Sequence, residues 1–254
     1  MNKLEKKLRE KEKNFIGFLT GGDPSLEKLQ LMVKALEDGG CDVIEIGVPF
    51  SDPLADGPII QSAGQRAIER GVNLKSIFDE ISKFRDDVKV PLVFLIYYNS
   101  IYNYGVKEFV KKCEEVGIDG LIIPDLPYEE QEEMLQYLDQ EKVALIPFAT
   151  PTSNERMKKT LSKGSGFVYT VSSLGVTGRE SDFYRDFEKY IEKVKKYSDI
   201  PVAVGFGISN PEDVKKIYEY VDNVIVGTAI VKKIHETDGD YESVKNYIKK
   251  LLNS

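Results

Sequence analysis

The chain has 254 residues, which is long enough for one large domain or two small ones. Hydrophobic residues make up 41% and charged residues 30%, the balance of a globular protein with a sizeable core. The net charge of -7 comes from acidic and basic residues mixed along the chain, so neither nucleic acid nor an anionic membrane is an expected partner. There is no stretch of 18 apolar residues and no signal-peptide pattern, and we therefore expect a cytoplasmic protein.

The few cysteine and histidine residues argue against several kinds of catalytic site. Cys41 and Cys113 lack metal-ligand spacing and are typical of small, buried apolar residues. The single histidine, His235, lies in a polar segment near the end of a short predicted helix, where a surface position is expected. We therefore expect no Ser-His-Asp triad and no metal site. Catalysis would have to use carboxylates, tyrosines or backbone dipoles.

The first predicted element is a charged amphipathic helix over residues 1–13, with Leu4 and Leu8 on one face. We expect it to pack over the bottom of the fold. Eight short apolar runs rich in Val, Ile and Phe follow in chain order, as expected for strands that are buried on both faces. The runs are NFIGFLT (14–20), DVIEIG (42–47), PLVFLIY (91–97), DGLIIPD (119–125), VALIPFA (143–149), GFVYTV (166–171), PVAVGFG (201–207) and NVIVG (223–227).

Segments with helical periodicity separate these runs, and some of them carry clear start signals. Asp23-Pro24 and Asn210-Pro211 each place a capping residue before a proline at the first helical position. Two helical stretches, separated near Gly71, lie between residues 59 and 87. The unit after the second strand is therefore predicted to have an extra helix.

Strands that alternate with helices over this length predict a single (β/α)8 TIM-barrel domain over residues 1–254, with the N-terminal helix and the extra helix added. A doubly wound open sheet is the alternative, because periodicity alone does not exclude it. An internal similarity favours repeated units, since GGCDVIEIG and VGIDGLIIPD both join a helix end, a glycine, an aspartate and a buried strand. When Asp42 and Asp119 are aligned, Glu45 lies opposite Ile122, so that a charge replaces an apolar residue.

Glu45 is the first candidate for catalysis. Reactive groups of such barrels lie at the C-terminal ends of strands. Side chains alternate along a strand, so Glu45 faces the barrel interior if Ile44 and Ile46 face the helices. The alternative is a glutamate paired with a buried cation, but no predicted strand core contains Lys or Arg. An unpaired buried carboxyl has a raised pKa, which suits a group that both donates and accepts protons.

Two further carboxylates, Asp52 and Asp56, lie in the loop GVPFSDPLADGP that follows this strand. Three prolines restrict the loop backbone, and a glycine near either end gives it freedom. Solvated loop aspartates are the alternative, but a restricted loop beside an inward glutamate is expected to aim at least one carboxylate into the same opening. The spacing does not choose between Asp52 and Asp56.

Three glycine-bearing loops predict a phosphate site. SSLGVTG (172–178), GFGIS (205–209) and GTAIV (227–231) follow the predicted strands six, seven and eight. A short helix is expected to begin at Gly227-Thr228, and the loops after strands seven and eight are a frequent phosphate site in such barrels. Turns need glycine in any case, which is the alternative reading. These loops contain no Lys or Arg, so backbone amides and the helix dipole would hold the phosphate.

Apolar and aromatic residues near the strand ends are candidates for the walls of a compartment. Tyr169 faces inward by alternation and is either a core aromatic residue or a hydrogen-bond donor in a pocket. The other candidates are Phe18, Leu95, Tyr97 and Ile122.

At this point a family resemblance becomes visible. The chain resembles tryptophan synthase α subunits in IEIGVPFSDPLADGP (44–58), FLTGGDP (18–24), PDLPYEE (124–130), SSLGVTG, VGFGIS and VGTAIV. The first motif is long and specific, and the matches run in order from about Phe15 to His235. The resemblance implies a lyase of tryptophan biosynthesis that cleaves indole-3-glycerol phosphate into indole and glyceraldehyde 3-phosphate. It also implies a β-subunit partner in an α2β2 complex. Pyridoxal phosphate is expected on that partner, because no predicted strand here offers a lysine for a Schiff base.

The resemblance assigns roles by matching position. Glu45 would be the general acid–base that protonates indole C3 and handles the proton of the glycerol hydroxyl. Asp56 would accept a hydrogen bond from the indole N–H, and Asp52 would lie in the segment that contacts the β subunit. Thr177 would fold over the substrate and meet Asp56. The phosphate would be bound by Gly178, Gly207, Gly227 and Thr228. The indole pocket would be shaped by Phe18, Leu95, Tyr97, Ile122, Tyr169 and Phe206.

Some positions depart from the family pattern, and other functions stay open at this point. Thr228 stands where serine is common, while Tyr98 and Pro124 are larger or stiffer than expected, but none of these changes removes a reactive group. A lyase that works alone and releases free indole is one alternative function. A non-catalytic barrel that activates a β subunit is another. A different phosphate-binding barrel enzyme fits the fold but not the first motif.

Overall fold

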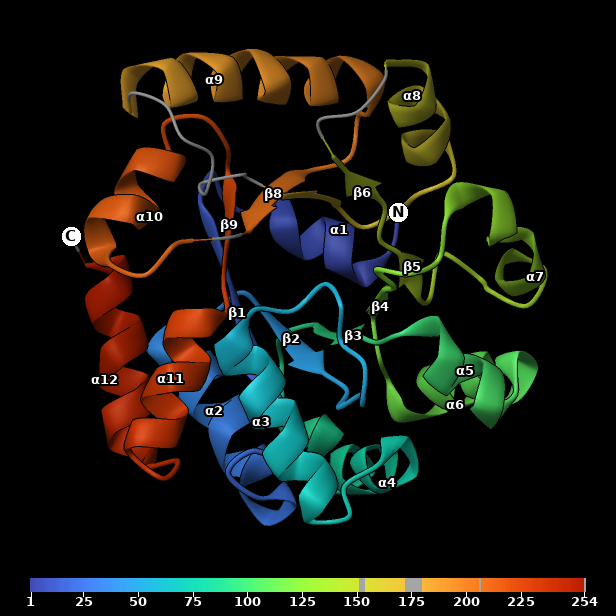
Figure 1. The fold of residues 1–254 in the computed structure, drawn as a ribbon, viewed down its shortest axis with the longest axis vertical. Helices are drawn as coiled ribbons and strands as arrows, with labels where there is room; N and C mark the ends of the chain where they lie inside the picture. Colours follow the sequence, from blue (N-terminus) through green and yellow to red (C-terminus); the bar gives the residue numbers. More distant parts are fainter. Residues whose placement is uncertain (151–153, 172–179, 206, 254) are drawn as a thin grey trace.

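The structure is a computed structural model, and it describes residues 1–150, 154–171, 180–205 and 207–253. Within these residues nine parallel strands form one curled sheet (Figure 1), in the order β5-β4-β3-β2-β1-β9-β8-β7-β6. The strands are β1 (Asn14–Thr20), β2 (Val43–Gly47), β3 (Leu92–Leu95), β4 (Gly120–Ile122), β5 (Ala144–Leu145), β6 (Phe148–Ala149), β7 (Val168–Val171), β8 (Val202–Gly205) and β9 (Asn223–Val226).

The two strands at the ends of this order, β5 and β6, are halves of the predicted fifth strand. Only Ile146 and Pro147 separate them, and Pro147 has no backbone N–H to donate to a neighbouring strand. The first half pairs with β4 and the second half with β7. The N–H of Ile146 donates to the carbonyl of Leu121, and the N–H of Tyr169 donates to the carbonyl of Pro147, both at 2.9 Å. This broken strand closes the sheet into a barrel, which confirms the predicted fold class and excludes the open sheet.

Helices surround the sheet in Figure 1. Both α3 and α4 lie between β2 and β3, so the predicted extra helix is confirmed. Among the described residues, no helix has the length and apolar character needed to cross a membrane. The helices and 3-10 turns are α1 (Lys3–Leu8), η1 (Leu26–Lys28), α2 (Leu29–Gly39), α3 (Pro58–Glu69), α4 (Leu74–Phe84), η2 (Arg85–Asp87), α5 (Tyr98–Tyr104), α6 (Val106–Val116), η3 (Tyr128–Glu130), α7 (Glu132–Leu135), α8 (Asn154–Ser162), α9 (Glu180–Tyr197), α10 (Pro211–Ile217), α11 (Thr228–Glu236) and α12 (Tyr241–Leu252).

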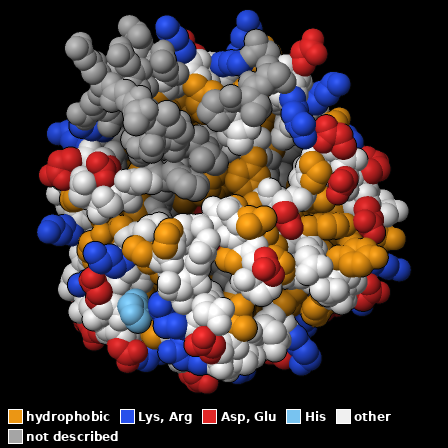
Figure 2. Space-filling view, viewed as in Figure 1, with side chains coloured by type: hydrophobic (Ala, Val, Ile, Leu, Met, Phe, Trp, Pro, Cys, Tyr) orange, Lys and Arg blue, Asp and Glu red, His pale blue; other side chains and the backbone are white. Residues whose placement is uncertain are grey.

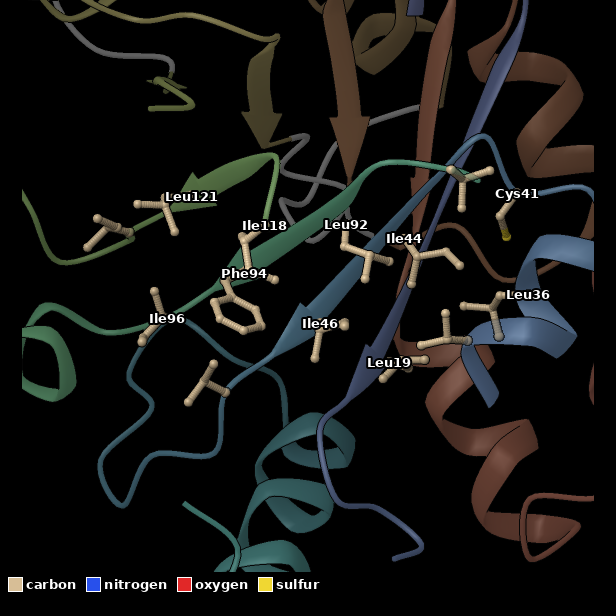
Figure 3. Packing of buried hydrophobic residues seen from close by; sticks show 14 of the residues in the cluster. Leu19, Leu36, Cys41, Ile44, Ile46, Leu92, Phe94, Ile96, Ile118 and Leu121 are labelled. Atoms are coloured by element: carbon tan, nitrogen blue, oxygen red, sulfur yellow. The ribbon is translucent and has the colours of Figure 1, made fainter. Parts of the chain in front are cut away.

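The apolar core has two layers, because each strand buries both of its faces. The outer layer lies between the sheet and the helices, where Ile44, Ile46 and Phe94 point toward the helices (Figure 3). The inner layer fills the barrel and includes Val43 and Val93. The predicted alternation along the second strand is therefore confirmed.

The N-terminal helix closes the bottom of the barrel, as predicted. Leu4 and Leu8 of α1 are buried and belong to the inner apolar layer. The helix is shorter than the predicted range and ends at Leu8. The Asn14 side chain donates to the Leu8 carbonyl at 2.9 Å, which satisfies a helix-end acceptor where the chain turns toward β1.

The two predicted proline caps have different outcomes. Asn210 caps α10, and its side chain accepts the N–H of Asp213 at 2.9 Å. The Asp23 prediction is wrong, because the next helical turn, η1, begins at Leu26 with Ser25 in the capping position. Asp23 is instead buried and accepts two hydrogen bonds from Arg66, at 2.9 and 2.7 Å. This ion pair ties the loop after β1 to α3.

Candidate active site

A cavity of about 770 Å³ opens at the C-terminal ends of the strands. Figure 2 shows hydrophobic side chains gathered around a central hollow, with charged side chains of both signs around it. The cavity contains residues from strands far apart in the sequence, as expected at the catalytic end of a barrel. Eight predicted site residues line it: Phe18, Glu45, Leu95, Asp56, Tyr169, Gly207, Gly227 and Thr228.

Glu45 lies inside this cavity on β2, between Phe18 of β1 and Val93 of β3 in the strand register. Its side chain is almost fully buried, with 1% exposed. In the described part of the chain Glu45 has no ion pair, and its Oε2 atom has no hydrogen-bond partner. Burial, helped by the negative charge of Asp56, raises the pKa of Glu45 to about 8. The carboxyl group is therefore protonated near neutral pH.

The two aspartates in the loop after β2, which the sequence could not distinguish, lie in different environments. Asp56 is half-buried and lines the cavity, whereas Asp52 is exposed and accepts a hydrogen bond from the Ser51 hydroxyl at 2.6 Å. Burial raises the pKa of Asp56 to about 6, and a hydrogen bond from the Tyr97 hydroxyl opposes this shift. Asp56 is therefore the second carboxyl of the cavity and is mostly ionised at neutral pH.

Tyr169 shares the cavity with the two carboxyl groups. It packs against Phe148, with ring centroids 5.1 Å apart. Burial, together with the charges of Glu45 and Asp56, raises the pKa of Tyr169, so its hydroxyl stays protonated as a hydrogen-bond donor. A side chain at Gly205 would not fit beside it, because a Cβ atom there would lie 2.6 Å from the Tyr169 hydroxyl.

The opposite side of the cavity is formed by the described residues of the glycine loops after β8 and β9. Gly227 is the N-cap residue of α11, and Thr228 begins this helix, as the sequence predicted. Within the described residues no side chain caps this helix, so its first amides are available at the cavity as donors for an anion. Lys232 and Lys233 also line this end, one turn further along α11. Glu236 lines this end as well and pairs with Lys232 at 3.8 Å, so the α11 end has two lysines and one glutamate, while Glu45 and Asp56 lie at the other end.

Several predicted residues are not in the cavity wall. Tyr97 and Ile122 are buried but do not line it, and Ile122 belongs to the inner apolar layer. Thr177, Gly178 and Phe206 lie outside the described residues. In the described part of the chain, no group of three His, Cys, Asp or Glu residues is placed to hold a metal ion.

The cavity also contains residues that sequence reasoning missed, including Ile60, Phe148 and Ile225. Alternation along the strands would have found Phe148 and Ile225, which point inward with Tyr169. Lys232 lies four residues after Thr228, on the same face of α11, and this helical spacing would have found it.

The geometry agrees with what the chain resembles across its whole length. The family model described as "Tryptophan synthase alpha chain" matches residues 4–253. A tryptophan synthase alpha chain from Thermoanaerobacter sp. (strain X514) is 45% identical over 258 residues, which cover 99% of this chain and 98% of the relative. One from Alkaliphilus metalliredigens is 44% identical and covers 98% of this chain and 95% of the relative.

Solved structures give the same result. Tryptophan synthase subunit alpha from Campylobacter jejuni has a TM-score of 0.88 and 34% identity, and the match covers 95% of this chain and 96% of that one. The subunit from Legionella pneumophila has a TM-score of 0.90 and 30% identity, and the match covers 100% of this chain and 98% of that one. Because sequence and structure agree over nearly the full length, this chain belongs to the tryptophan synthase alpha chain family.

Proposed function

We propose that Glu45 and Asp56 carry out the α reaction of tryptophan synthase in this chain. This reaction cleaves indole-3-glycerol phosphate into indole and glyceraldehyde 3-phosphate, a step of tryptophan biosynthesis. The observation that carries the proposal is the buried Glu45 carboxyl, which has no partner in the described residues and shares a cavity with Asp56. An unpaired buried carboxyl is costly for folding, and such groups are concentrated at functional sites.

Glu45 would act as acid and then as base. With a pKa of about 8 it holds a proton near neutral pH and donates that proton to indole C3. The bond between C3 and the glycerol chain then breaks, and its electron pair returns to the indole ring. The hydroxyl group on the departing carbon loses its proton to the Glu45 carboxylate and becomes the aldehyde of glyceraldehyde 3-phosphate. The enzyme ends the cycle with Glu45 protonated again.

Asp56 would stabilise the charge that this proton transfer creates. Protonation at C3 places positive charge on the indole nitrogen, and an ionised carboxylate that accepts the N–H hydrogen bond stabilises it. The pKa of about 6 keeps Asp56 mostly ionised at pH 7, while Glu45 is still protonated. The two carboxyl groups therefore have different protonation states at the same pH, as their two roles require.

The substrate phosphate would bind at the other end of the cavity. The first amides of α11 and the Thr228 hydroxyl are donors there, and Gly207 and Gly227 leave room for a close approach of the backbone. Lys232 and Lys233 add positive charge near this end. The apolar side chains of Phe18 and Leu95, with Tyr169, would hold the indole ring between the two ends. We extend the family roles to Thr177, Gly178 and Phe206 by sequence position alone.

The chain works with a tryptophan synthase β subunit, as members of its family do. We propose that the exposed tip of the loop after β2, which includes Asp52 and the 94% exposed Leu54, contacts that subunit. Pyridoxal phosphate would reside on the β subunit, and this chain would need no cofactor of its own. We further propose that residues 1–254 form one domain and that the complex is cytoplasmic.

The decisive measurement is indole-3-glycerol phosphate cleavage by the chain alone and with its β subunit. We expect slow cleavage alone and a large increase with the β subunit. Fast cleavage that the β subunit does not increase would favour a lyase that works alone, and no cleavage in either case would favour a non-catalytic activator. Glu45→Gln and Asp56→Asn should each lower cleavage by about 10² to 10⁴-fold. Glu69→Gln, the same chemical change on the outer part of α3, is the matched control.

A further inference from the structure

Tyr97 follows β3 and contacts the loop after β2 at two points. Its ring stacks on Phe50, with centroids 4.9 Å apart and an angle of 20° between the planes. Its hydroxyl accepts a hydrogen bond from the backbone N–H of Ala55 at 3.0 Å. The side chain is 3% exposed and does not line the cavity. Tyr97 therefore lies behind the loop that carries Asp56, in a place where it supports the loop and does not form the wall.

The same hydroxyl group also reaches the Asp56 carboxylate. A tyrosine hydroxyl has one hydrogen to donate and lone pairs to accept with. It accepts the N–H of Ala55 at 3.0 Å, and its interaction with the neighbouring Asp56 carboxylate lowers the pKa of that group. One hydroxyl group therefore acts on the backbone of one residue and on the side chain of the next. The amide of Gln61 holds the Asp56 carbonyl from the other side, at 2.9 Å.

We propose that Tyr97 is a positioning residue, which holds the Asp56 carboxylate at the cavity through the hydroxyl group that also binds the Ala55 N–H. The inference rests on the proposed role of Asp56 and adds a residue that acts through it. The tip of the loop faces solvent, since Ser51, Asp52 and Leu54 are exposed. Hydrogen bonds from within the loop shape its turn, and Tyr97 joins that turn to the rigid end of β3.

This arrangement has an electrostatic consequence that a packing role would lack. The titratable groups that act on this site are Glu45 from β2, Tyr169 from β7 and Asp125, which acts on Tyr97 itself. Among the described residues, the hydroxyl of Tyr97 is the group that lowers the pKa of Asp56 and so opposes burial, and the resulting pKa is about 6. Without that hydroxyl the pKa of Asp56 rises further. Because Asp56 acts as an anion, activity is lost as pH falls through its pKa, and the variant should lose it at a higher pH.

The test compares Tyr97→Phe with Tyr98→Phe in the complex with the β subunit. Both changes remove one hydroxyl, but the Tyr98 hydroxyl donates to Glu133 at 2.9 Å and does not contact Asp56. We expect Tyr97→Phe to lower kcat/KM for indole-3-glycerol phosphate cleavage about tenfold at pH 7 and to move the acidic limb of the pH profile upward. Tyr98→Phe should leave the limb in place. Hydrogen exchange in the segment 50–57 should become faster in Tyr97→Phe only.

The outcomes separate this inference from the proposed function. If Asp56→Asn abolishes cleavage but Tyr97→Phe leaves the acidic limb unmoved, the inference is overturned and the role of Asp56 stands. An equal loss of activity and an equal limb shift in both tyrosine variants would also overturn it. If Asp56→Asn leaves cleavage intact, the proposed function of Asp56 fails first. Thermal unfolding of both variants checks that each is folded, since Tyr97→Phe keeps the ring that stacks on Phe50.

Discussion

The units that contain β2 and β4 begin alike and end differently. Asp42 and Asp119 precede the two strands, and each carboxylate accepts the N–H of a residue 27 positions earlier, Phe15 and Leu92 respectively, at 2.9 Å. Each aspartate also donates its own N–H to the carbonyl of that same residue, at 2.8 Å. Each aspartate thus fastens its strand to the preceding barrel strand at the bottom of the sheet.

The difference lies three residues further along. Ile122 fills the inner apolar layer, whereas Glu45, at the matching position, places a carboxyl group in the cavity. The repeated part of the two units holds the barrel together, and the part that differs contains the carboxyl group that we propose for catalysis. In a barrel these two tasks fall to opposite ends of the strands, so one end can stay the same while the other changes.

The largest expected effect comes from making β2 a copy of β4. Glu45→Ile removes the proposed proton donor and puts an apolar side chain in its place, like that of Ile122 in β4. We expect cleavage of indole-3-glycerol phosphate to fall by about 10³-fold or more while the protein stays folded. Product formation in the β-subunit complex measures the first effect, and thermal unfolding measures the second. Retention of more than a tenth of the activity would mean that Glu45 is not the proton donor.

The second prediction concerns how the free energy of unfolding depends on pH through Glu45 of β2. In the unfolded chain Glu45 ionises near 4.5, and in the folded protein its pKa is about 8. Between these values the folded protein holds a proton that the unfolded chain has released, so the free energy of unfolding falls as the pH rises. Relative to the wild type, Glu45→Gln should therefore gain stability between pH 5 and 8, by about 4 kcal/mol in total. Denaturant titrations at several pH values measure this, and a constant difference between the two proteins would contradict it.

The third prediction tests whether the two fastening aspartates are equivalent. Asp119 is paired with Arg85, whose side chain is 12% exposed, and also with the 51% exposed Lys3, whereas Asp42 is paired with Lys11, whose side chain is 51% exposed. The better-buried pair should matter more. We expect Asp119→Asn to destabilise the protein by about 2 kcal/mol, and Asp42→Asn by about 1 kcal/mol. Activity per folded molecule should not change in either variant, and urea unfolding measures the order. Equal losses of stability would show that the cation's burial does not decide the cost.

The smallest expected effect concerns Gly120, the first residue of β4, which stands where β2 has Val43. A Cβ atom at Gly120 would lie 3.0 Å from the Ile146 side chain and 3.1 Å from the Leu4 side chain, so this glycine leaves room for the helix that closes the barrel. We expect Gly120→Ala to destabilise the protein by about 1 kcal/mol. Gly64→Ala is the matched control, because nothing lies within 4 Å of a Cβ atom there, and in helix α3 it should be neutral or stabilising. A loss of stability at Gly64 and none at Gly120 would reverse this interpretation.

The sequence predicted the barrel well because the signals involved are local. Val- and Ile-rich runs mark strands that are buried on both faces, and alternation placed Glu45 inside without knowledge of its neighbours. Asp23 shows where local signals fail. Before a proline it has the pattern of a helix cap, but Arg66, 43 residues away, pairs with it instead. Distant partners of this kind do not appear in any short window of sequence.

The candidate site was predictable to a similar degree. Spacing could not choose between Asp52 and Asp56, because the choice depends on how the loop folds back over the barrel. Tyr97 was expected in the pocket wall for the same local reason as Leu95, since both lie near the end of one strand. Its position behind the Asp56 loop depends on contacts with Phe50 and Ala55, which the sequence of β3 does not contain.

The broken fifth strand has a consequence for how the barrel would open. Residues 144–149 are the seam of the sheet, because they pair with β4 before Pro147 and with β7 after it. The pairs β4–β5 and β6–β7 each have two residue pairs in register, whereas β1 and β2 have five. One residue inserted between Ile146 and Pro147 would shift the register of one side of the seam against the other. In this variant the hydrogen bonds between residues 144–149 and the neighbouring strands should break first when the barrel opens. Hydrogen exchange would show this as early loss of protection in β5, β6 and the β7 edge that faces them.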